Sequence, residues 1–279
     1  MMRRRGIQLK SPGQVRLMRR AGLVVAEALA AMERAVAPGV STAALDQIAR
    51  EVLDRAGATS NFLGYDLGAG PFPAVICSSV NDRVVHGIPS PAEVLRAGDL
   101  ISVDFGAVVE GWHADAAITV AVGEVSAEAA ALSEATRRSL WDGMAAIRVG
   151  RRLGDVEHAV QRSVQASGDY GILAGYGGHG IGTEMHQDPH VLNYGQPGRG
   201  PRLHQGLVLA VEPMVTLGGD DSIELPDGWA VATADGSLSA HWEHTVALLA
   251  DGLWVLTAPD GGRAELTARG APISSLADD

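Results

Sequence analysis

Two stretches that lie far apart in this chain share one pattern, and that pattern limits the folds the chain can adopt. Gly98-Asp-Leu-Ile-Ser-Val-Asp104 and Gly206-Leu-Val-Leu-Ala-Val-Glu212 both run from a glycine through a mostly apolar segment to a carboxylate. Each predicts a strand that carries one acidic residue to its end. Isolated burial of a carboxylate is very costly, so both acids must be paired, hydrogen-bonded or bound to a metal. The pattern therefore points toward chemistry rather than packing alone.

Two further acids extend this similarity. Asp115 lies shortly before Thr119-Val120, and Glu243 lies shortly before Thr245-Val246, so each acid precedes a short strand pattern. The repetition predicts an internal duplication, in which two halves form a sheet with pseudo-twofold symmetry and the site lies between them. The alternative is that amphipathic strands resemble one another without a common origin.

The order of the predicted elements favours an α+β fold. Helix patterns cover about 12–37, 41–56, 126–148 and 154–167, and strand patterns cover 74–77, 100–105, 117–122, 208–215, 229–233 and 245–249. The second and third strand patterns flank Glu110-Gly111 and predict a hairpin. Strands and helices do not alternate regularly, which argues against a doubly wound sheet. We expect a flexible tail at 1–10, a single catalytic domain at 11–258, and a partly disordered tail at 259–279.

Composition excludes several classes of protein. The chain has 279 residues, of which 46% are hydrophobic, enough for the core of one large domain or two small ones. Its formal net charge of −11 argues against a general binder of nucleic acid or anionic membranes. Cys77 is the single cysteine, which suits a reducing compartment. Neither a signal peptide nor an apolar stretch of membrane-spanning length is apparent, so we expect a soluble, cytoplasmic protein.

Five side chains are candidate metal ligands: Asp104, Asp115, His179, Glu212 and Glu243. Four carboxylates and one imidazole are an ordinary supply of ligands for a pair of divalent ions, and this oxygen-rich set suits Mn²⁺, Fe²⁺ or Co²⁺ at least as well as Zn²⁺. Two such ions can share a bridging water and ionise it near neutral pH. The set therefore predicts a hydrolytic centre.

Each of these residues also has a structural alternative. Asp104 could begin a turn, Asp115 could lie at a hairpin edge, and Glu243 could form a salt bridge. A lone histidine among glycines, such as His179, usually has no catalytic or metal-binding role. Glu212 is harder to dismiss because an apolar run precedes it. The joint occurrence of all five carries the prediction.

Two more histidines are candidates for moving a proton or stabilising an oxyanion near such ions. They are His86, in the segment Asn81 to Pro89, and His186, which follows His179 by seven positions. The glycine-rich stretch 175–180 matches GxGxxG, but it lacks the strand and βαβ unit of a dinucleotide site. Its glycines are better explained by close approach of the backbone to a site.

The motifs together resemble type I methionine aminopeptidase, of the pita-bread (M24-like) metallopeptidase family, from about Ile7 to Leu256. The resemblance rests on the segments Lys10–Pro12 with Met18–Gly22, Pro38–Thr42, Ser79–Pro89, Val103–Gly106, Trp112–Asp115, Gly178–Gly182, Val211–Pro213 and Ser239–Thr245. It implies a pita-bread fold, an α+β core of antiparallel sheet flanked by helices. It also implies removal of the initiator methionine from nascent chains whose second residue is small.

The resemblance further implies roles for the candidate residues. The five candidate ligands match the family's metal ligands, with Asp104 and Asp115 on one ion, Asp104 and Glu243 bridging, and His179 and Glu212 completing the second ion. The ions could be Co²⁺, Mn²⁺, Fe²⁺, Zn²⁺ or Ni²⁺. Glu212, His86 and His186 match catalytic residues: Glu212 is the general base, His186 contacts the scissile carbonyl region, and His86 assists the leaving amide or the tetrahedral intermediate. The methionine pocket would consist of Tyr65, Phe72, Cys77, His86, Met185 and Trp229.

Five departures from the family pattern affect the site. Met185 stands where an aromatic residue is common, Gln187 replaces a usual acid, His241 replaces a usual glutamine, Trp242 stands where Tyr or Phe is common, and the loop 66–70 is lengthened. The longer loop puts the position of Tyr65 in question. All five candidate ligands are present.

Two other functions remain open from the sequence. A prolidase-like enzyme usually carries a large extra N-terminal domain, for which the stretch before Phe72 leaves no room. A non-catalytic binding module would be expected to lose ligands. The expected partners are nascent polypeptide N-termini, reached by a monomer that associates with ribosomes or acts free of them, without direct binding to nucleic acid or membranes.

Overall fold

The computed structural model describes residues 6–66 and 68–278. Its helices are α1 (Pro12–Ala35), α2 (Thr42–Ala56), α3 (Ala127–Ala145), α4 (Leu153–Ser167), α5 (Arg263–Ala268) and the 3₁₀ turn η1 (Ser275–Asp278). Antiparallel sheets lie between the helices, so the predicted α+β class is confirmed. None of the helices in this part of the chain combines the length and the apolar character needed to cross a membrane.

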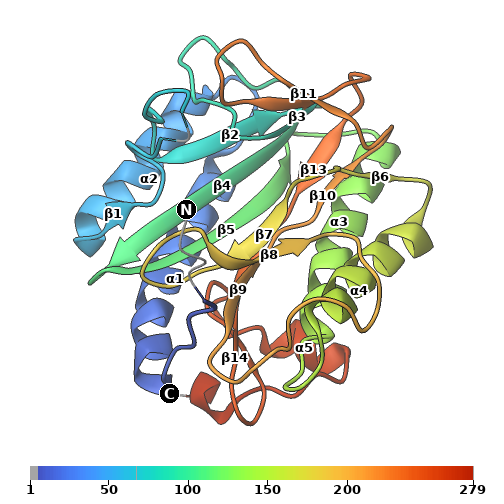
Figure 1. Cartoon of the computed structure of the whole chain (residues 1–279). Coiled ribbons are helices and arrows are strands. Elements are labelled where there is room, and N and C mark those ends of the chain that lie inside the picture. Colours follow the sequence, from blue (N-terminus) through green and yellow to red (C-terminus); the bar gives the residue numbers. More distant parts are fainter. Residues whose placement is uncertain (1–5, 67, 279) are drawn as a thin grey trace.

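The first half of the molecule is a sheet packed on α1 and α2 (Figure 1). Its long central strand β4 (Leu100–Val109) pairs along one edge with β5 (Trp112–Ala121) and along the other with β2 (Ile76–Val80) and β1 (Thr59–Ser60). The predicted hairpin is confirmed, since Glu110 and Gly111 turn between β4 and β5 with φ of 51° and 79°. Apolar residues of both helices and of the sheet, among them Val25, Leu45 and Phe105, form the core of this half.

The second half packs its strands against α3 and α4 (Figure 1). One sheet has the order β15 (Leu253–Val255), β14 (His244–Leu248), β9 (Val208–Val211), β7 (Gly177–Gly180), β8 (Gln187–Leu192). Another has the order β13 (Ser239–His241), β10 (Met214–Thr216), β6 (Gly171–Ile172). A third joins β11 (Ser222–Glu224) and β12 (Val231–Thr233) to β3 (Arg83–Val85) of the first half.

The repeat seen in the sequence reappears in the turns that begin β4 and β9. Gly98 and Gly206 both have positive φ, at 98° and 88°. The Gly98 N–H donates to the carbonyl of Val122 at 2.9 Å, and the Gly206 N–H donates to that of Leu248 at 2.8 Å. Each glycine thus ties the start of its strand to the end of the neighbouring antiparallel strand. In each half, therefore, an equivalent glycine turn begins the strand that leads to the acidic residue.

The segment 208–215, predicted as one strand, is divided. Strands β9 and β10 belong to different sheets, and the chain passes from one sheet to the other at Glu212-Pro213. The returning strands β13 and β14 change sheet at the facing position, Trp242-Glu243. Proline has no N–H to donate to a sheet, which favours a break at Pro213. Glu212 and Glu243 consequently lie at irregular positions, where their side chains are free to turn toward the cavity.

Backbone contacts at this break join the two halves. Glu243 and Ala117 of β5 exchange hydrogen bonds, with Glu243 N to Ala117 O at 2.9 Å and Ala117 N to Glu243 O at 3.3 Å. Nearby, the Thr119 hydroxyl donates to the carbonyl of His241 at 2.8 Å. The acid of the second half is therefore held directly against the strand that carries Asp115.

Parts of both expected tails, within residues 6–10 and 259–278, contact the rest of the fold. Lys10 donates its N–H to the carbonyl of Gly206 at 2.7 Å, which fixes the segment 6–10 against the start of β9. The expectation for 1–5 lies outside the described residues. In the C-terminal segment, α5 buries Leu266 in the core of the second half, and Arg269 donates to Asp142 of α3 at 2.6 Å. Leu266 and the ion pairs of Glu265 with Arg137 and of Arg269 with Asp142 hold this short helix against α3, and they produce no strong sequence pattern.

Candidate active site

All the site residues predicted from the sequence line one cavity of about 900 Å³. They are Tyr65, Phe72, Cys77, His86, Asp104, Asp115, His179, Met185, His186, Glu212, Trp229 and Glu243. The cavity also includes residues that sequence reasoning did not single out, among them Gln8, Phe62, Tyr176 and Met214. Its wall combines a polar end of carboxylates and imidazoles with an apolar end.

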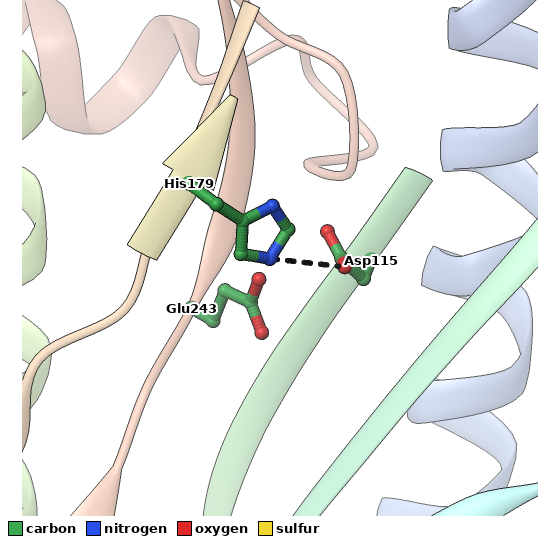
Figure 2. Close-up of side chains that lie close together, drawn as sticks. All are labelled: Asp115, His179 and Glu243. Carbon is green, nitrogen blue, oxygen red and sulfur yellow. Dashed lines mark ion pairs between the residues drawn. The ribbon is translucent and has the colours of Figure 1, made fainter. Parts of the chain in front are cut away.

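The polar end is built from strands of both halves. Asp115 of β5, His179 of β7 and Glu243, just before β14, point toward one another (Figure 2), and their ligand atoms all lie within 4.8 Å of each other. His179 Nε2 lies 3.7 Å from Asp115 Oδ2 and 3.5 Å from Glu212 Oε1. Thr245 fixes Asp115 by accepting its backbone N–H at 3.1 Å and donating to its Oδ1 at 3.2 Å. Such a cluster could hold a metal ion.

The hydrogen bond of His179 indicates which of its nitrogens faces the carboxylates. Nδ1 lies 3.0 Å from the carbonyl oxygen of Gly180, which can only accept, so Nδ1 carries the proton. Burial lowers the pKa of His179 to about 4, so at neutral pH Nε2 has a lone pair and no proton. A lone pair directed at two carboxylate oxygens is stabilised by a cation between them. A carbonyl that holds the far nitrogen is also the usual arrangement for a metal-binding histidine.

Unpartnered polar atoms give independent support for a cation. Asp104 Oδ1 and Glu243 Oε1 are buried without a hydrogen-bond partner among residues 6–66 and 68–278. Each buried, unsatisfied polar atom costs about 1–3 kcal/mol, and more when it is charged. Burial, and then the nearby Asp115 carboxylate, raise the pKa of Asp104, Glu212 and Glu243 well above the usual range. The oxygen-rich set fits divalent cations, which would relieve both the desolvation and the mutual repulsion.

His241, which sequence reasoning did not name as a site residue, lies behind the polar end, next to Glu212. It lies on β13 with 1% of its surface exposed, and its Nε2 has no hydrogen-bond partner in the described part of the chain. That nitrogen is 3.8 Å from Glu212 Oε2, and a second potential ligand cluster consists of Glu212, His241 and Glu243. The signal in the sequence was its departure from the glutamine of the family pattern. The two oxygens of Glu212 thus face different imidazoles, Oε1 toward His179 and Oε2 toward His241.

The apolar end is one compact cluster. It consists of Phe62, Phe72, Ala74, Cys77, Met185 and Trp229, with Tyr65 and Ile88 packed against it. The Phe72 ring meets Trp229 edge-on at 5.1 Å and Phe62 at 6.5 Å. Burial, and then Asp104, raise the pKa of the Cys77 thiol, so the thiol stays neutral. Met185 fills the position where the family pattern has an aromatic ring, which makes this part of the wall flexible and polarisable.

His86 and His186 lie between the two ends. His86 follows β3 with a positive φ of 60°, uncommon for a residue other than glycine, and burial lowers the pKa of its imidazole. The His186 ring meets His179 edge-on at 4.4 Å, and its Nδ1 lies 2.7 Å from the hydroxyl oxygen of Tyr65. Burial, and then His179, lower the pKa of His186 to about 4. Both imidazoles are neutral at physiological pH.

The N-terminal segment closes one side of the cavity. Gln8 lines it and accepts a hydrogen bond from the Gln187 side chain at 2.9 Å. The buried Lys10 donates to the Gln187 side chain at 3.2 Å and to the carbonyl of Gln8 at 3.0 Å. The amide of Gln187 therefore serves as both donor and acceptor, which a carboxylate could not do.

A comparison with known families agrees with this arrangement. Residues 16–249 match the model of metallopeptidase family M24. The chain belongs to metallopeptidase family M24. Among curated relatives of this M24 chain, methionine aminopeptidase 1 of Mycobacterium tuberculosis is 55% identical over 91% of the chain and 96% of the relative. A methionine aminopeptidase of Clostridium acetobutylicum is 48% identical over 90% of the chain and 98% of the relative.

Solved structures of two peptidases share its fold. The methionine aminopeptidase of Thermotoga maritima superposes with a TM-score of 0.87 at 38% identity, covering 90% of this chain and 99% of that one. The prolidase of Pyrococcus furiosus superposes with a TM-score of 0.69 at 19% identity, and 65% of its length is covered. The second likeness concerns the fold alone. The predicted pita-bread architecture is thus confirmed.

Proposed function

We propose that this chain is a methionine aminopeptidase, which removes the initiator methionine from polypeptides whose second residue is small. One observation carries the proposal: the metal-ligand cluster and the apolar cluster line the same cavity. An N-terminal methionine presents a free amine, a thioether side chain and the scissile carbonyl within a few bonds of each other. An acidic, ligand-rich end beside an apolar end complements those groups. The names of the relatives over nearly the full chain support the same activity.

The apolar cluster is proposed as the methionine pocket. Phe72, Cys77, Met185 and Trp229 supply apolar and soft surface, which suits a flexible thioether. Tyr65 and His86 lie at its edge and line the same cavity. We expect the pocket to discriminate against charged or branched side chains chiefly by shape and desolvation.

The five candidate ligands are proposed to hold two divalent ions. Asp115, His179 and Glu243 bring their ligand atoms within 4.8 Å of one another and would hold an ion there, with Asp104 and Glu212 as further carboxylate ligands. Such ions supply a bound water that ionises near neutral pH. The ligand set accepts Mn²⁺, Fe²⁺, Co²⁺, Zn²⁺ or Ni²⁺, and availability decides between them.

Three side chains of this site are proposed to move or hold protons. Glu212, whose pKa burial raises, accepts a proton from the attacking water and passes it on. His186, at the mouth of the cavity, donates a hydrogen bond to the scissile carbonyl oxygen as negative charge develops there. His86, which lines the same cavity, stabilises the leaving amide.

The wider setting of the enzyme follows from the same proposal. Its substrates are the N-termini of nascent polypeptides, which it meets as a cytoplasmic monomer near the ribosome. The net charge of −11 disfavours direct contact with nucleic acid. All the proposed ligands lie within 11–258, the proposed catalytic domain, and both halves contribute to them.

Peptide turnover tests the proposal. After reconstitution with each candidate metal in turn, the enzyme is expected to release methionine from Met-Ala-Ser and to leave an X-Pro peptide intact. The variant Glu212→Gln should lower kcat/KM by at least about 100-fold, since it removes the proposed base and one ligand. Metal content is measured in parallel.

Glu33→Gln is the matched control because Glu33 is exposed on α1, away from the cavity. It should behave as wild type. Stoichiometric metal without hydrolysis of either peptide contradicts the proposal, and preferential cleavage of the X-Pro peptide would favour a prolidase-like activity instead.

A further inference from the structure

Tyr65 makes a contact that a role in the pocket wall does not explain. Its hydroxyl oxygen lies 2.7 Å from Nδ1 of His186, and the two rings meet edge-on with centroids 5.3 Å apart. His186 Nδ1 is therefore occupied, and Nε2 is the nitrogen left to act on a ligand. The role of His186 depends on which of the two nitrogens carries the proton.

The contact is best described as the hydroxyl donating to the imidazole. Burial raises the pKa of Tyr65, so the phenol keeps its proton at physiological pH. A separation of 2.7 Å is typical of an O–H donor and shorter than most N–H···O bonds. A phenol is also a better donor than acceptor, since its oxygen lone pair is delocalised into the ring. Nδ1 then accepts, and the single proton of the neutral imidazole is on Nε2.

The backbone around Tyr65 holds the hydroxyl in place. Tyr65 N–H donates to the carbonyl of Phe62 at 2.9 Å, and the carbonyl of Tyr65 accepts from Phe72 N–H at 2.8 Å. Asp66 Oδ1 accepts from the N–H groups of Gly68 and Gly70 at 2.7 and 3.2 Å, which closes the lengthened loop on itself. The loop that differs from the family pattern is thus the element that presents the tyrosine.

A second contact fixes the other side of the imidazole. The rings of His179 and His186 are perpendicular, with centroids 4.4 Å apart. His179 is itself oriented by the Gly180 carbonyl. His186 is therefore held between one residue of the ligand cluster and Tyr65, and rotation of its ring would break the hydrogen bond.

We propose that Tyr65 is a positioning residue, whose hydroxyl donates to Nδ1 of His186 and keeps Nε2 protonated for donation to the scissile carbonyl oxygen. The catalytic part of this inference rests on the proposed function, because it needs a substrate carbonyl at His186. The tautomer itself does not depend on it. Tyr65 then acts through His186 rather than by touching the reacting atoms.

Nuclear magnetic resonance tests the tautomer directly. Long-range ¹H–¹⁵N spectra of protein labelled at histidine distinguish a protonated from an unprotonated ring nitrogen, and His186→Asn identifies the signals of His186. In the metal-free wild type we expect unprotonated Nδ1 and protonated Nε2. In Tyr65→Phe, which keeps the ring and removes the hydroxyl, the two ¹⁵N shifts should move toward each other as the tautomers mix.

Kinetics tests the consequence. Tyr65→Phe should lower kcat for a Met-Ala-Ser peptide on the order of tenfold and leave KM nearly unchanged, since the lost orientation acts mainly in the transition state. Tyr170→Phe is the matched control because Tyr170 packs among residues of α3 and α4, outside the cavity. It should change neither the spectrum nor the rate.

The outcomes separate this inference from the proposed function. A protonated Nδ1 in the wild type, or an unchanged His186 spectrum in Tyr65→Phe, overturns the inference even if methionine is released normally. Absence of methionine release by the wild type contradicts the proposed function, and with it the catalytic role, but leaves the tautomer result standing. If Tyr170→Phe lowers kcat as much as Tyr65→Phe does, the effect is not specific to the contact with His186, and Tyr65 has only a structural role.

Discussion

At the scale of single residues, His241 shows how a departure from the family pattern fits the site. Its backbone is fixed by N–H bonds to the hydroxyls of Ser102 and Thr119, at 3.2 and 3.0 Å. Its side chain ends 3.8 Å from Glu212 Oε2, slightly beyond hydrogen-bond length. Burial lowers the pKa of His241 to about 3, so the imidazole is neutral and can donate a single N–H to that oxygen. Glutamine carries an N–H donor as well, so both residues can orient Glu212.

Substitution of His241 should therefore affect metal binding according to the donor that remains. We expect His241→Phe to weaken binding of Co²⁺ by about tenfold or more, because Glu212 loses the group that orients its second oxygen. His241→Gln should stay within about threefold of wild type, since its amide can donate to the same carboxylate. Calorimetric titration of the metal-free protein measures both.

The pair of variants also distinguishes orientation from direct ligation. Glutamine is a much poorer ligand for Co²⁺ than imidazole. If His241→Gln weakens binding as much as His241→Phe and changes the Co²⁺ absorption spectrum, His241 is a ligand and the orienting role is wrong.

The candidate ligands could be named from the sequence because each follows a recognisable strand or glycine motif. His241 and Phe62 could not be named as site residues from patterning alone. Phe62 reaches the cavity only because its loop folds back to put it 6.5 Å from Phe72, and no periodicity encodes that contact. The hydrogen bond between Tyr65 and His186 joins residues 121 positions apart, so it depends on tertiary packing.

At the scale of elements, local sequence signals predicted helix ends reliably. They did not predict where the chain passes from one sheet to another. The start of α1 was predictable because Ser11 and Gln14 cap it reciprocally and Pro12 begins it. The end of α2 was predictable because Gly57 adopts the left-handed conformation, with φ of 60°. The break between β9 and β10 was hidden by a continuous apolar run on both sides of Glu212-Pro213. Apolar character reports burial, and it does not report which sheet a strand joins.

The close contact between β7 and β9 depends on a glycine beside His179. A Cβ on Gly178 would lie 2.1 Å from the carbonyl oxygen of Ala210 and 3.4 Å from Glu212 Cγ. Gly178→Ala must therefore separate the two strands. We expect it to lower the free energy of unfolding by about 2–3 kcal/mol and to reduce activity, because His179 lies on β7 and Glu212 directly follows β9. Denaturant titration and peptide turnover measure the two effects.

Gly13→Ala provides the control for this prediction. A Cβ there has only Ser11 Oγ nearby, at 4.0 Å, and alanine is the better helix former. It should leave activity unchanged and stability unchanged or slightly higher. Wild-type stability and turnover in Gly178→Ala would mean that the contact between the strands is looser than described.

At the scale of the whole molecule, the site opposes folding unless cations are bound. The pKa values of Asp104, Glu212 and Glu243 are raised in the metal-free protein, so the folded state holds protons that the unfolded state releases. The stability due to these groups is fully present at low pH, and it is lost as pH rises through their folded-state pKa values. The lowered pKa values of His179, His186 and His241 have the opposite effect, which is largely complete above about pH 7.

The stability of the metal-free protein should therefore fall between about pH 7 and 8. Each extra proton that the folded state retains over this window contributes a loss of about 1.4 kcal/mol. Above pH 8 the lowered pKa of Lys10, about 8, adds a change of the opposite sign, so the window ends there. Denaturant titrations in EDTA at three pH values measure the slope.

Titrations with saturating Mn²⁺ are the comparison. Bound metal keeps the carboxylates deprotonated in the folded state, so the fall should disappear. A metal-free protein whose stability is flat or rises over the same window would show that these carboxylates are already ionised in the fold.

The hydrogen bonds between Glu243 and Ala117 have a consequence for how the molecule comes to be active. Asp104 and Asp115 come from the first half, and Glu212 and Glu243 come from the second, so neither half can surround an ion by itself. Each half has its own core and its own helices. A competent site exists only after the two have docked along this seam. During refolding, enzymatic activity should therefore return only after the two halves have docked. It should appear later than the spectroscopic signals that report helices or strands alone.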